Sequence, residues 1–304
     1  MKSSSPNPAK TSPVLASEHE GYDNLPVEHW SLLRLQLLWI FDGPMLKSSI
    51  DYPYFPHPIA AWFLRKGSVT LSFPDGKEHY EAGHWLFPRH QQGRQHFSKD
   101  AELISLRFYA EWPSGAPLFS RKKTVIIPQQ QAPALLEAAE PLASYARQHL
   151  TPADYNGIML KGSLGAYLGV QSLIARWMDV WYQTFISLGY EPELVGPISD
   201  TVNQCLAYLR SRKLDRPFYE KELVERVGLS VSQIHRLFIK QVKVTPKEFW
   251  NNRRIEFARL ALIGGNENIK SIAFSLGFQT PESFGRWFQN NVGYTPSTFR
   301  TMLH

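Results

Sequence analysis

The pattern of apolar and polar positions changes once along the chain. Between about Trp30 and Ile127 the apolar residues come in short runs, separated by turn-forming pairs at Lys66-Gly67, Asp75-Gly76 and Ala82-Gly83. Short strands at intervals of roughly ten residues, with turn residues between them, are typical of a β-sandwich or barrel. The first part of the chain is therefore predicted to form such a β-domain.

From Ala132 onward the apolar positions follow a helical period. A first segment, "APALLEAAEPLASYARQHL", is expected to be broken by Pro141, and a longer helical run extends from about Asp154 to Gly189. The longer run carries two apolar ridges, Leu160, Leu164, Tyr167, Ile174, Met178, Trp181 and Phe185 in one and Leu173, Trp177 and Val180 in the other. A helix this apolar is covered on more than one side. Two coverings remain open: packing against the β-domain, or packing against the same helix of a second subunit.

A short unit occurs twice after the Pro- and Gly-containing segment at residues 190–198. "VGLS…RLF" at residues 227–238 matches "LGFQ…RWF" at residues 276–288, and a Thr-Pro pair follows each copy. Each copy predicts a short helix, a glycine turn and a second helix with a hydroxyl N-cap, Ser230 or Thr280. Pro281 suits the first position of such a helix. This is helix-turn-helix geometry, in which the second helix enters the major groove of DNA.

The segment between the two copies predicts one continuous helix. Thr245 is expected to cap it, Pro246 to open it, and Gly264-Gly265 to end it. About eighteen residues span about 27 Å, which is close to the roughly 34 Å of one DNA turn. A rigid helix of this length would let both recognition helices enter successive segments of the major groove.

The distribution of charged residues also indicates that the C-terminal third of the chain binds a partner. Residues 195–304 contain 16 Lys and Arg against 9 Asp and Glu, whereas residues 1–194 contain 17 against 18. A basic C-terminal third indicates a polyanionic partner, or else a solvated basic face without one.

Other features of the sequence indicate the cellular compartment of the protein. Cys205 is the single cysteine, which excludes an internal disulfide and fits a reducing cytosol. The N-terminal "MKSSSPNPAKTSPVLASEHEG" lacks the apolar region of a signal peptide and reads as a disordered tail. The most apolar run, "LLRLQLLWIF", is too short to span a bilayer. The expectation is a cytoplasmic protein without a membrane segment.

Residues 198–304 resemble the DNA-binding domain of the AraC/XylS family of bacterial transcription regulators. The resemblance rests on "GLS…IHRLF…VTP…F", "RRIEFARLAL", "IKSIAFSLGFQTPESFGRWF" and "GYTPSTFR". Two positions depart from the family: Lys243 replaces the glycine that ends the first recognition helix, and Gly285 replaces a side chain in the second. The first departure is expected to strain the helix end, and the second to remove a contact.

Helix phase and this resemblance together assign the DNA-reading residues. The exposed side of the first recognition helix is expected to carry Ser232, His235 and Arg236, and that of the second Glu282, Ser283 and Arg286. An arginine fits the O6/N7 pair of guanine, and a glutamate can accept from the amino group of cytosine. The open alternative is that the two arginines contact only phosphates.

The β-region resembles the family's cupin-like, jelly-roll regulatory domain in the stretch "GSVTLSFPDGKEHYEAGHWLFPRHQQGRQHF". The resemblance implies a pocket for a small polar effector, a sugar above all. Trp62, Trp85, Arg89 and His96 have the side-chain types that such a pocket needs. The alternative is that both tryptophans belong to the core and that Arg89 and His96 are solvated.

A metal site is a weaker interpretation of the same region. Metal-binding cupins use a closely spaced His-x-His, and His57, His79, His84, His90 and His96 include no such pair. No metal, cofactor or catalytic residue is therefore assigned.

The sequence thus predicts a multidomain chain: a tail at 1–24, a cupin-like jelly-roll domain at 25–130, a helical dimerisation and linker region at 131–192, and an all-α domain with two helix-turn-helix motifs at 193–304. The expected function is a ligand-responsive transcription activator that binds DNA as a homodimer and, from the resemblance, contacts RNA polymerase. An effector-independent regulator, and a cupin enzyme tethered to a DNA-binding module, remain as alternatives.

Overall fold

The computed structural model describes residues 27–56, 58–152, 160–194, 198–263 and 267–301, so the expected tail at 1–24 lies outside the described residues. The β-region contains α1 (Val27–Trp30), β1 (Arg34–Pro44), η1 (Lys47–Ser49), β2 (Asp51–Tyr54), β3 (Ile59–Lys66), β4 (Ser68–Phe73), β5 (Gly76–Glu81), β6 (His84–Phe87), β7 (Gly93–Phe97), β8 (Glu102–Glu111), β9 (Val125–Pro128) and η2 (Gln129–Gln131). The helical part contains α2 (Pro133–His149), the short β10 (Thr151–Pro152) and β11 (Leu160–Lys161), α3 (Leu164–Ser187), α4 (Asp200–Ser211), α5 (Lys221–Val227), α6 (Val231–Val242), α7 (Pro246–Ile263), α8 (Ile269–Ser275), α9 (Pro281–Val292) and α10 (Pro296–Thr301).

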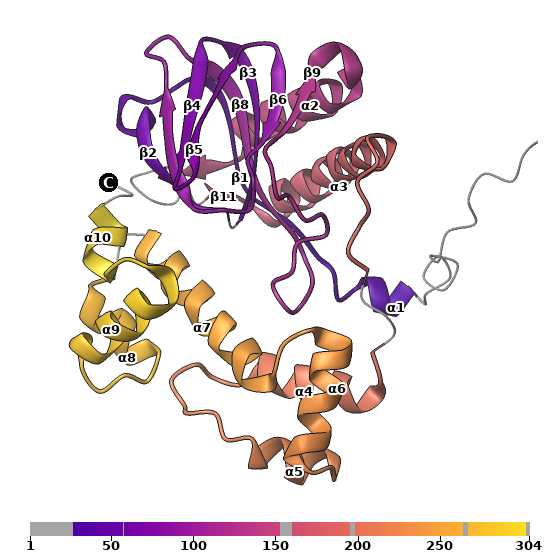
Figure 1. The fold of residues 1–304 in the computed structure, drawn as a ribbon, viewed down its shortest axis with the longest axis vertical. Coiled ribbons are helices and arrows are strands. Elements are labelled where there is room, and N and C mark those ends of the chain that lie inside the picture. The colour runs from indigo at the N-terminus through magenta and orange to yellow at the C-terminus, as the bar shows by residue number, and fades with distance from the viewer. Residues whose placement is uncertain (1–26, 57, 153–159, 195–197, 264–266, 302–304) are drawn as a thin grey trace, which may run out of the picture.

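Two antiparallel sheets form the N-terminal domain (Figure 1). The larger sheet has the strand order β1-β8-β3-β6-β9, and the smaller has β2-β7-β4-β5. An apolar core of side chains from both sheets, including Trp62, Leu71 and Phe97, lies in this domain. Gly67 and Gly83 adopt positive φ values of 76° and 89° at two of the expected turns, a conformation that favours glycine. The antiparallel β-structure predicted from the sequence is confirmed, and it is compatible with a jelly roll.

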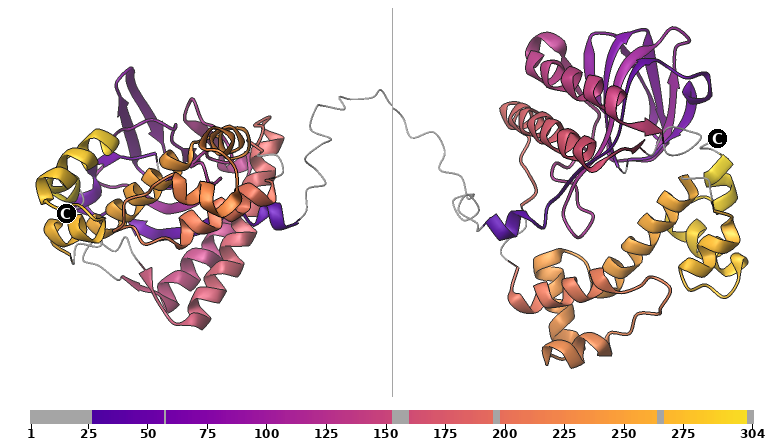
Figure 2. Two further views of the ribbon diagram at one scale, coloured as in Figure 1. Left: turned by 90° about the horizontal axis from the view of Figure 1, so that it is seen from below. Right: turned by 180° about the vertical axis from the view of Figure 1, so that it is seen from behind.

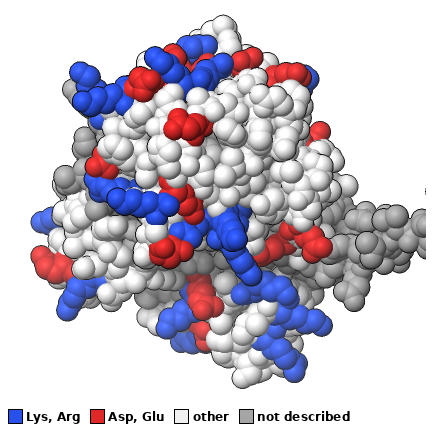
Figure 3. All heavy atoms as spheres, turned by 45° about the horizontal axis from the view of Figure 1, so that its top comes forward, with Lys and Arg blue, Asp and Glu red and all other residues white. Residues whose placement is uncertain are grey.

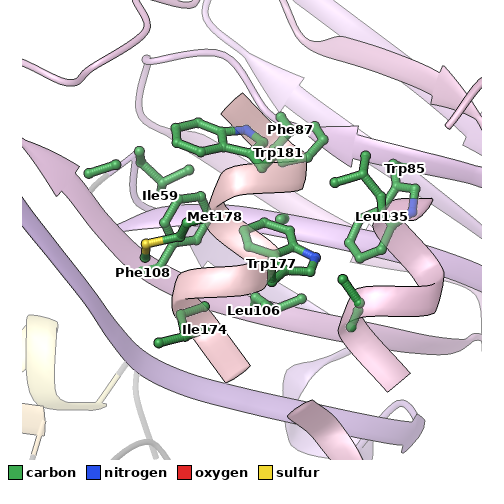
Figure 4. Close-up of a cluster of buried hydrophobic side chains, with 14 of the residues drawn as sticks. Ile59, Trp85, Phe87, Leu106, Phe108, Leu135, Ile174, Trp177, Met178 and Trp181 are labelled. Carbon is green, nitrogen blue, oxygen red and sulfur yellow. The ribbon is translucent and has the colours of Figure 1, made fainter. Parts of the chain in front are cut away.

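Helices α2 and α3 cover the outer face of the larger sheet, as Figures 2 and 4 show. Strand residues that point away from the inner core, such as Trp85, Leu106 and Phe108, meet Trp177 and Trp181 of α3 there (Figure 4). The ring centroids of Phe108 and Trp177 lie 5.1 Å apart at a steep angle, a favourable aromatic arrangement. Packing against the β-domain therefore covers the middle and the C-terminal half of α3.

The expected break at Pro141 is wrong, because α2 runs without interruption through it. Proline in a helix removes one hydrogen bond and crowds the preceding turn. Pro141 lies on the exposed side of α2, where water can reach the carbonyl group that lacks a donor. The buried face of the helix, with Leu135, Leu142 and Ala146, supplies the packing that keeps it continuous.

The expected start of the long helix near Asp154 also needs correction. Leu160 and Lys161 pair as a strand with Pro152 and Thr151, and α3 begins only at Leu164. Ser163 is its N-cap, since its Oγ accepts from the amide of Ala166 at 3.1 Å. Residues 153–159 lie outside the described residues. As a result, Leu160 is not part of the helical ridge, and Leu164, Tyr167 and Leu168 form an exposed apolar end of α3.

The C-terminal part consists of helices only, arranged as two units along α7 (Figures 1 and 2). The core of the first unit includes Leu206, Phe238 and Trp250, and that of the second includes Leu262, Phe284 and Phe288. Because α7 supplies Trp250 to one core and Leu262 to the other, it is built into both units. The predicted all-α domain with two helix-turn-helix motifs is confirmed.

Candidate nucleic-acid interface and the neighbouring cavity

The first unit has the turn that the sequence predicted. Helix α5 ends at Gly228, whose φ of 68° places it in the left-handed region. Helix α6 then begins at Ser230, whose Oγ accepts from the amide of Gln233 at 3.3 Å. The side chain of Gln233 accepts in return from the amide of Ser230 at 2.9 Å, which completes a capping box. Ile234 and Phe238 anchor the buried face of the helix.

The second unit repeats this geometry. Gly277 has a φ of 73°, and Thr280 caps α9 by accepting from the amide of Ser283 at 3.2 Å. Phe284 and Phe288 take the places of the two buried residues of α6. The two recognition helices, α6 and α9, are each 12 residues long. The repeat in the sequence is thus a repeat in structure.

Four of the six predicted DNA-reading residues are exposed. Ser232 and Arg236 lie on the exposed side of α6, and Glu282 and Arg286 on that of α9. The other two residues are partly buried. The Oγ of Ser283 donates to the carbonyl of Thr280 at 2.8 Å.

His235 makes a side-chain contact of its own in the first unit. Its Nε2 lies 2.7 Å from Oε1 of Glu220, just before α5. The contact links the recognition helix to the preceding helix of the same unit. Nε2 of His235 is therefore already in contact with Glu220. Only the other ring nitrogen, Nδ1, is left to form a hydrogen bond with a base.

Hydrogen bonds near the start of the connecting helix α7 cap it and join it to the second unit. Thr245 caps it by accepting from the amide of Glu248 at 3.2 Å, and Glu248 accepts from the amide of Thr245 at 2.7 Å. In the second unit, Asn251 of α7 accepts from Nε1 of Trp287 at 2.9 Å and donates to Asn291 at 2.8 Å. The 18 residues of α7 form a rigid helix about 27 Å long that both units share.

The basic excess of this domain is only partly available to a partner. Lys240, Lys243 and Lys247 are exposed near the end of α6 and the start of α7. Arg253 and Arg254 of α7 are half-buried instead and donate to the carbonyls of Leu209 and Leu276. On the face seen in Figure 3, basic and acidic side chains are mixed over most of the surface, and basic side chains gather at the lower right. Part of the charge asymmetry in the sequence is therefore structural.

A cavity of about 950 Å³ lies where the N-terminal domain meets α7. Its lining includes Arg34 of β1, Arg107 and Glu111 of β8, and Glu256 and Arg259 of α7. Nη1 of Arg34 lies 3.4 Å from Oε1 of Glu111 and also binds Glu256, so it joins the two domains. Burial raises the pKa of Glu111 to about 7, and the neighbouring Arg34 opposes this only in part.

The structure does not bring the four predicted effector residues together. Trp62 pairs with Leu86 in the larger sheet and faces the inner core, where it also lines the cavity. Trp85 is one position away from Leu86, so it points to the opposite face and packs against α3 (Figure 4). The two tryptophans therefore cannot contact the same ligand.

Arg89 and His96 are placed elsewhere. Arg89 is nearly buried, and its Nη1 donates to Oδ2 of Asp75 at 2.8 Å while its guanidinium lies 3.9 Å from the ring centre of Phe73. The hydrogen bond from Arg89 lowers the pKa of Asp75. His96 is exposed on β7. Neither residue lines the cavity.

The sequence interpretation missed the polar residues that do line it. Ser105, Arg107, Tyr109 and Glu111 alternate with Leu106, Phe108 and Ala110 along β8. A strand has a side-chain period of two, so these four residues share one face. Polar residues at every second position of an otherwise apolar strand were the available signal.

The described residues contain neither a candidate metal site nor a candidate membrane span. No group of three or more His, Cys, Asp and Glu side chains in these ranges could hold a metal ion. None of the described helices combines the length and apolar character needed to cross a membrane.

Comparison with known proteins matches the C-terminal part. A family model described as a helix-turn-helix domain matches residues 223–302. The HTH-type transcriptional regulator MtrA of Neisseria gonorrhoeae is 26% identical over 121 residues, which cover 39% of this chain and 40% of that protein. An uncharacterized HTH-type transcriptional regulator of Staphylococcus aureus strain MSSA476 is 35% identical over 105 residues, which cover 33% of this chain and 13% of that protein. The match thus spans less than half the length of these relatives.

Among solved structures, ToxT from Vibrio cholerae has 13% sequence identity and a TM-score of 0.46, covering 89% of this chain and 98% of the ToxT chain. The C-terminal domain of the response regulator yesN from Fusobacterium nucleatum has 22% identity and a TM-score of 0.31, covering 34% of this chain and 99% of that domain.

Proposed function

We infer that the whole chain is a DNA-binding transcription regulator, on the premise that residues 223–302 are an AraC-type helix-turn-helix domain. The observation that carries the inference is the duplicated unit: two capped recognition helices in two units that share one rigid helix. The length of α7, about 27 Å, is close to one turn of DNA, which suits reading of two successive major-groove segments on one side of a duplex. A tandem site is therefore the DNA target that this geometry favours.

Base reading is assigned to exposed side chains of the two recognition helices. Arg236 and Arg286 occupy equivalent positions of α6 and α9, and both are exposed. Ser232 and Glu282 lie one turn earlier on the same sides. We also keep His235 and Ser283 as base-reading residues. His235 already contacts Glu220 through Nε2, and the Oγ of Ser283 already donates to the carbonyl of Thr280.

The test replaces each arginine in the full chain by alanine. Arg236→Ala and Arg286→Ala should each weaken binding to the cognate site by roughly 1–3 kcal/mol and relax the preference at one base position. A selection from randomised duplexes gives the preference, and a titration gives the affinity. Lys240→Ala is the matched control on the exposed surface of α6, where a cation lost near the backbone weakens all sequences alike.

Salt dependence separates base reading from phosphate contact. An arginine that contacts only a phosphate would lower the slope of log K against log salt by about one, with base preference unchanged. If both alanine variants keep the wild-type preference at every position, these arginines do not read bases.

An effector that controls DNA binding is the second part of the proposal. Its support is the cavity between the N-terminal domain and α7, because a ligand there would contact both the regulatory domain and the helix that spaces the two units. Of the residues assigned from the sequence, Trp62 alone lines this cavity, so the effector site is moved from Trp85, Arg89 and His96 to it. An effector-independent regulator predicts that no small molecule changes DNA affinity.

A homodimer is proposed through the exposed apolar end of α3. Leu164, Tyr167 and Leu168 are 72%, 54% and 57% exposed there, whereas the rest of the apolar face is buried on the β-sheet. Apolar side chains grouped on one exposed helix end suit contact with a second copy.

Sedimentation of the full chain tests this assembly. Leu168→Glu should convert a dimer into a monomer at micromolar concentration, because it places a charge in the apolar contact. Arg176→Glu, on an exposed part of the same helix, should leave the dimer intact. A wild-type protein that sediments as a monomer would refute the proposed dimer.

The remaining assignments follow from the resemblance of the C-terminal part. We propose a cytoplasmic activator that contacts RNA polymerase and performs no catalytic step. Activation is tested by transcription with purified polymerase from a promoter that carries the tandem site, with Arg236→Ala as the control. A decrease in transcription would show that the protein is a repressor and not an activator.

A further inference from the structure

Arg107 lines the cavity between the two domains. It lies on β8 between Ser105 and Tyr109, on the strand face that lines the cavity. Register pairs it with Trp39 of β1 on one side and Ala60 of β3 on the other, so the larger sheet fixes its position.

No ion pair of Arg107 occurs within the part of the chain that the structure describes. Its Nη1 donates to the carbonyls of Phe55 at 3.1 Å and Pro58 at 3.3 Å, and its guanidinium lies within 6 Å of the ring centres of Tyr54 (5.6 Å) and Trp62 (5.9 Å). Burial lowers its pKa, and the side chains that oppose this are tyrosines. Arg107 is half-buried, and a charge with reduced access to water usually has an opposite charge beside it, as Arg34 and Arg89 do in this protein. Arg107 therefore has no counter-ion among the residues that the structure describes.

Other residues of the cavity lining also carry unused polar atoms. The Tyr52 hydroxyl and Oε1 of Gln95 are buried without a hydrogen-bond partner among the described residues. Tyr52 and Gln95 lie opposite each other on β2 and β7, in the smaller sheet.

Much of the remaining lining is apolar, with Trp39, Phe41, Met45 and Leu103 among its members. A cavity of about 950 Å³ lies at the upper end of the range for small-molecule sites. The chemistry suits a molecule with one anionic group and an apolar body.

The contacts of Arg107 continue into the second helix-turn-helix unit. Phe55, whose carbonyl accepts from Arg107, packs its ring 5.2 Å from that of Phe299 and 6.1 Å from that of Tyr294. Phe299 belongs to α10 and to the apolar core that holds α9. The guanidinium thus holds a segment of the N-terminal domain that touches the core behind a recognition helix.

We propose that Arg107 is the anchor of an effector site for an amphipathic anion, and that the anion takes donors of Arg107 away from the carbonyls of Phe55 and Pro58. Charge-assisted hydrogen bonds to an anion are about twice as strong as neutral ones, so the exchange is favourable. The contact of Phe55 with Phe299 then changes, and the position of α9 relative to the N-terminal domain changes with it. This inference rests on the proposed function, because it names the class of effector and the route by which it acts.

Binding is tested on the full chain with decanoate and decyl phosphate as anionic probes. Decanol and glucose are the neutral controls, one apolar and one polar. Both anions, or one of them, should raise the melting temperature in a saturable way, and the two arms distinguish a carboxylate from a phosphate effector. Glucose or decanol acting alone, or no saturable binding of either anion, would overturn the inference.

Variants identify the anchor. Arg107→Gln keeps hydrogen-bond donors and loses the charge, and should weaken the anionic probe at least about tenfold. Arg107→Lys should retain part of the affinity. Arg89→Gln, which alters another nearly buried arginine of the same domain outside the cavity, should bind as the wild type does. Equal affinity of Arg107→Gln and the wild type would overturn the assignment, and circular dichroism confirms that each variant is folded.

The route to DNA is tested separately through Phe55. In the wild type the bound probe should change affinity for the tandem site by about fivefold or more. Phe55→Ala should bind the probe normally but lose this change, and an undiminished change would refute the route. If the wild type binds no DNA sequence specifically in the titration, the proposed regulator function is contradicted. The melting temperature tests binding of the anionic probe independently of this result.

Discussion

At the scale of single residues, Lys243 adopts a left-handed backbone conformation, which is strained for a residue other than glycine. It ends α6 with a φ of 66°, the only positive φ outside glycine among the described residues. Its amide donates to the carbonyl of Phe238 at 3.0 Å, so the helix ends as it would with glycine. The expected strain at this helix end is therefore present, and α6 remains intact because Val242 and Phe238 are buried.

Lys243→Gly should raise the free energy of unfolding by about 0.5–1 kcal/mol. The left-handed conformation costs a side chain about 1–2 kcal/mol, and the greater freedom of glycine in the unfolded chain offsets part of the gain. Urea unfolding followed by circular dichroism measures the difference. Lys240→Gly, inside the exposed face of the same helix, should have the opposite sign, with a loss of about 1 kcal/mol. A loss of stability in Lys243→Gly would show that the lysine side chain stabilises the helix end.

At the scale of elements, the two helix-turn-helix units share a turn but not its surroundings. Gly228 and Gly277 both have positive φ. A Cβ at Gly228 would meet nothing within 4 Å, whereas one at Gly277 would collide with the carbonyl of Asp215. The second turn therefore packs on the segment before α5, and the first does not. The repeat in the sequence cannot show this difference, because Asp215 lies some sixty residues away.

Alanine at these two glycines should separate conformation from packing. Gly228→Ala should destabilise the chain by about 1–2 kcal/mol, from backbone strain alone. Gly277→Ala carries the same strain and should lose a further 1–3 kcal/mol, because backbone atoms must move apart. Urea unfolding of both variants beside the wild type gives the comparison. Equal losses would mean that the contact of Gly277 with Asp215 is not a constraint.

At the scale of the whole molecule, the two domains meet through charged and aromatic contacts around the cavity. Arg34 connects Glu111 of the β-domain with Glu256 of α7, and Phe55 packs on the second unit. Leu32 also packs on the core of the first unit. The N-terminal domain thus contacts each helix-turn-helix unit and the helix between them.

The buried Glu111 should make this contact sensitive to pH. Its pKa is raised from 4.5 to about 7, so the folded chain binds more protons than the unfolded chain between these values. Stability supplied by the protonated carboxyl is complete below pH 4.5 and is lost as the pH rises through about 7.

Glu111→Gln should remove this dependence. Its melting temperature should change less than that of the wild type between pH 5 and 8, because the amide does not titrate. The shift corresponds to at most about 3 kcal/mol at the high end. Glu102→Gln, exposed at the other end of β8, is the control. Parallel melting curves for the wild type and Glu111→Gln across this range would contradict the assignment.

The sequence by itself determined the elements whose signals are local. Turn residues, helix caps and periodicity predicted the β-strands, the bounds of α7 and both helix-turn-helix units, because each depends on residues within one or two turns of one another. Local rules failed at Pro141 and near Leu160, where packing of α2 and pairing of β11 with β10 decided the outcome.

Only the tertiary structure decided which polar residues meet. Trp62 and Trp85 have the same chemistry in the sequence, yet adjacent strands turn them to opposite faces of one sheet. In the sequence, Arg107 is one cation in a predicted strand. Only the fold places it in a cavity, with no counter-ion among the described residues, beside the segment that touches α10. Such a site depends on contacts between residues more than two hundred positions apart, such as Phe55 and Phe299, and local sequence patterns contain no information about them.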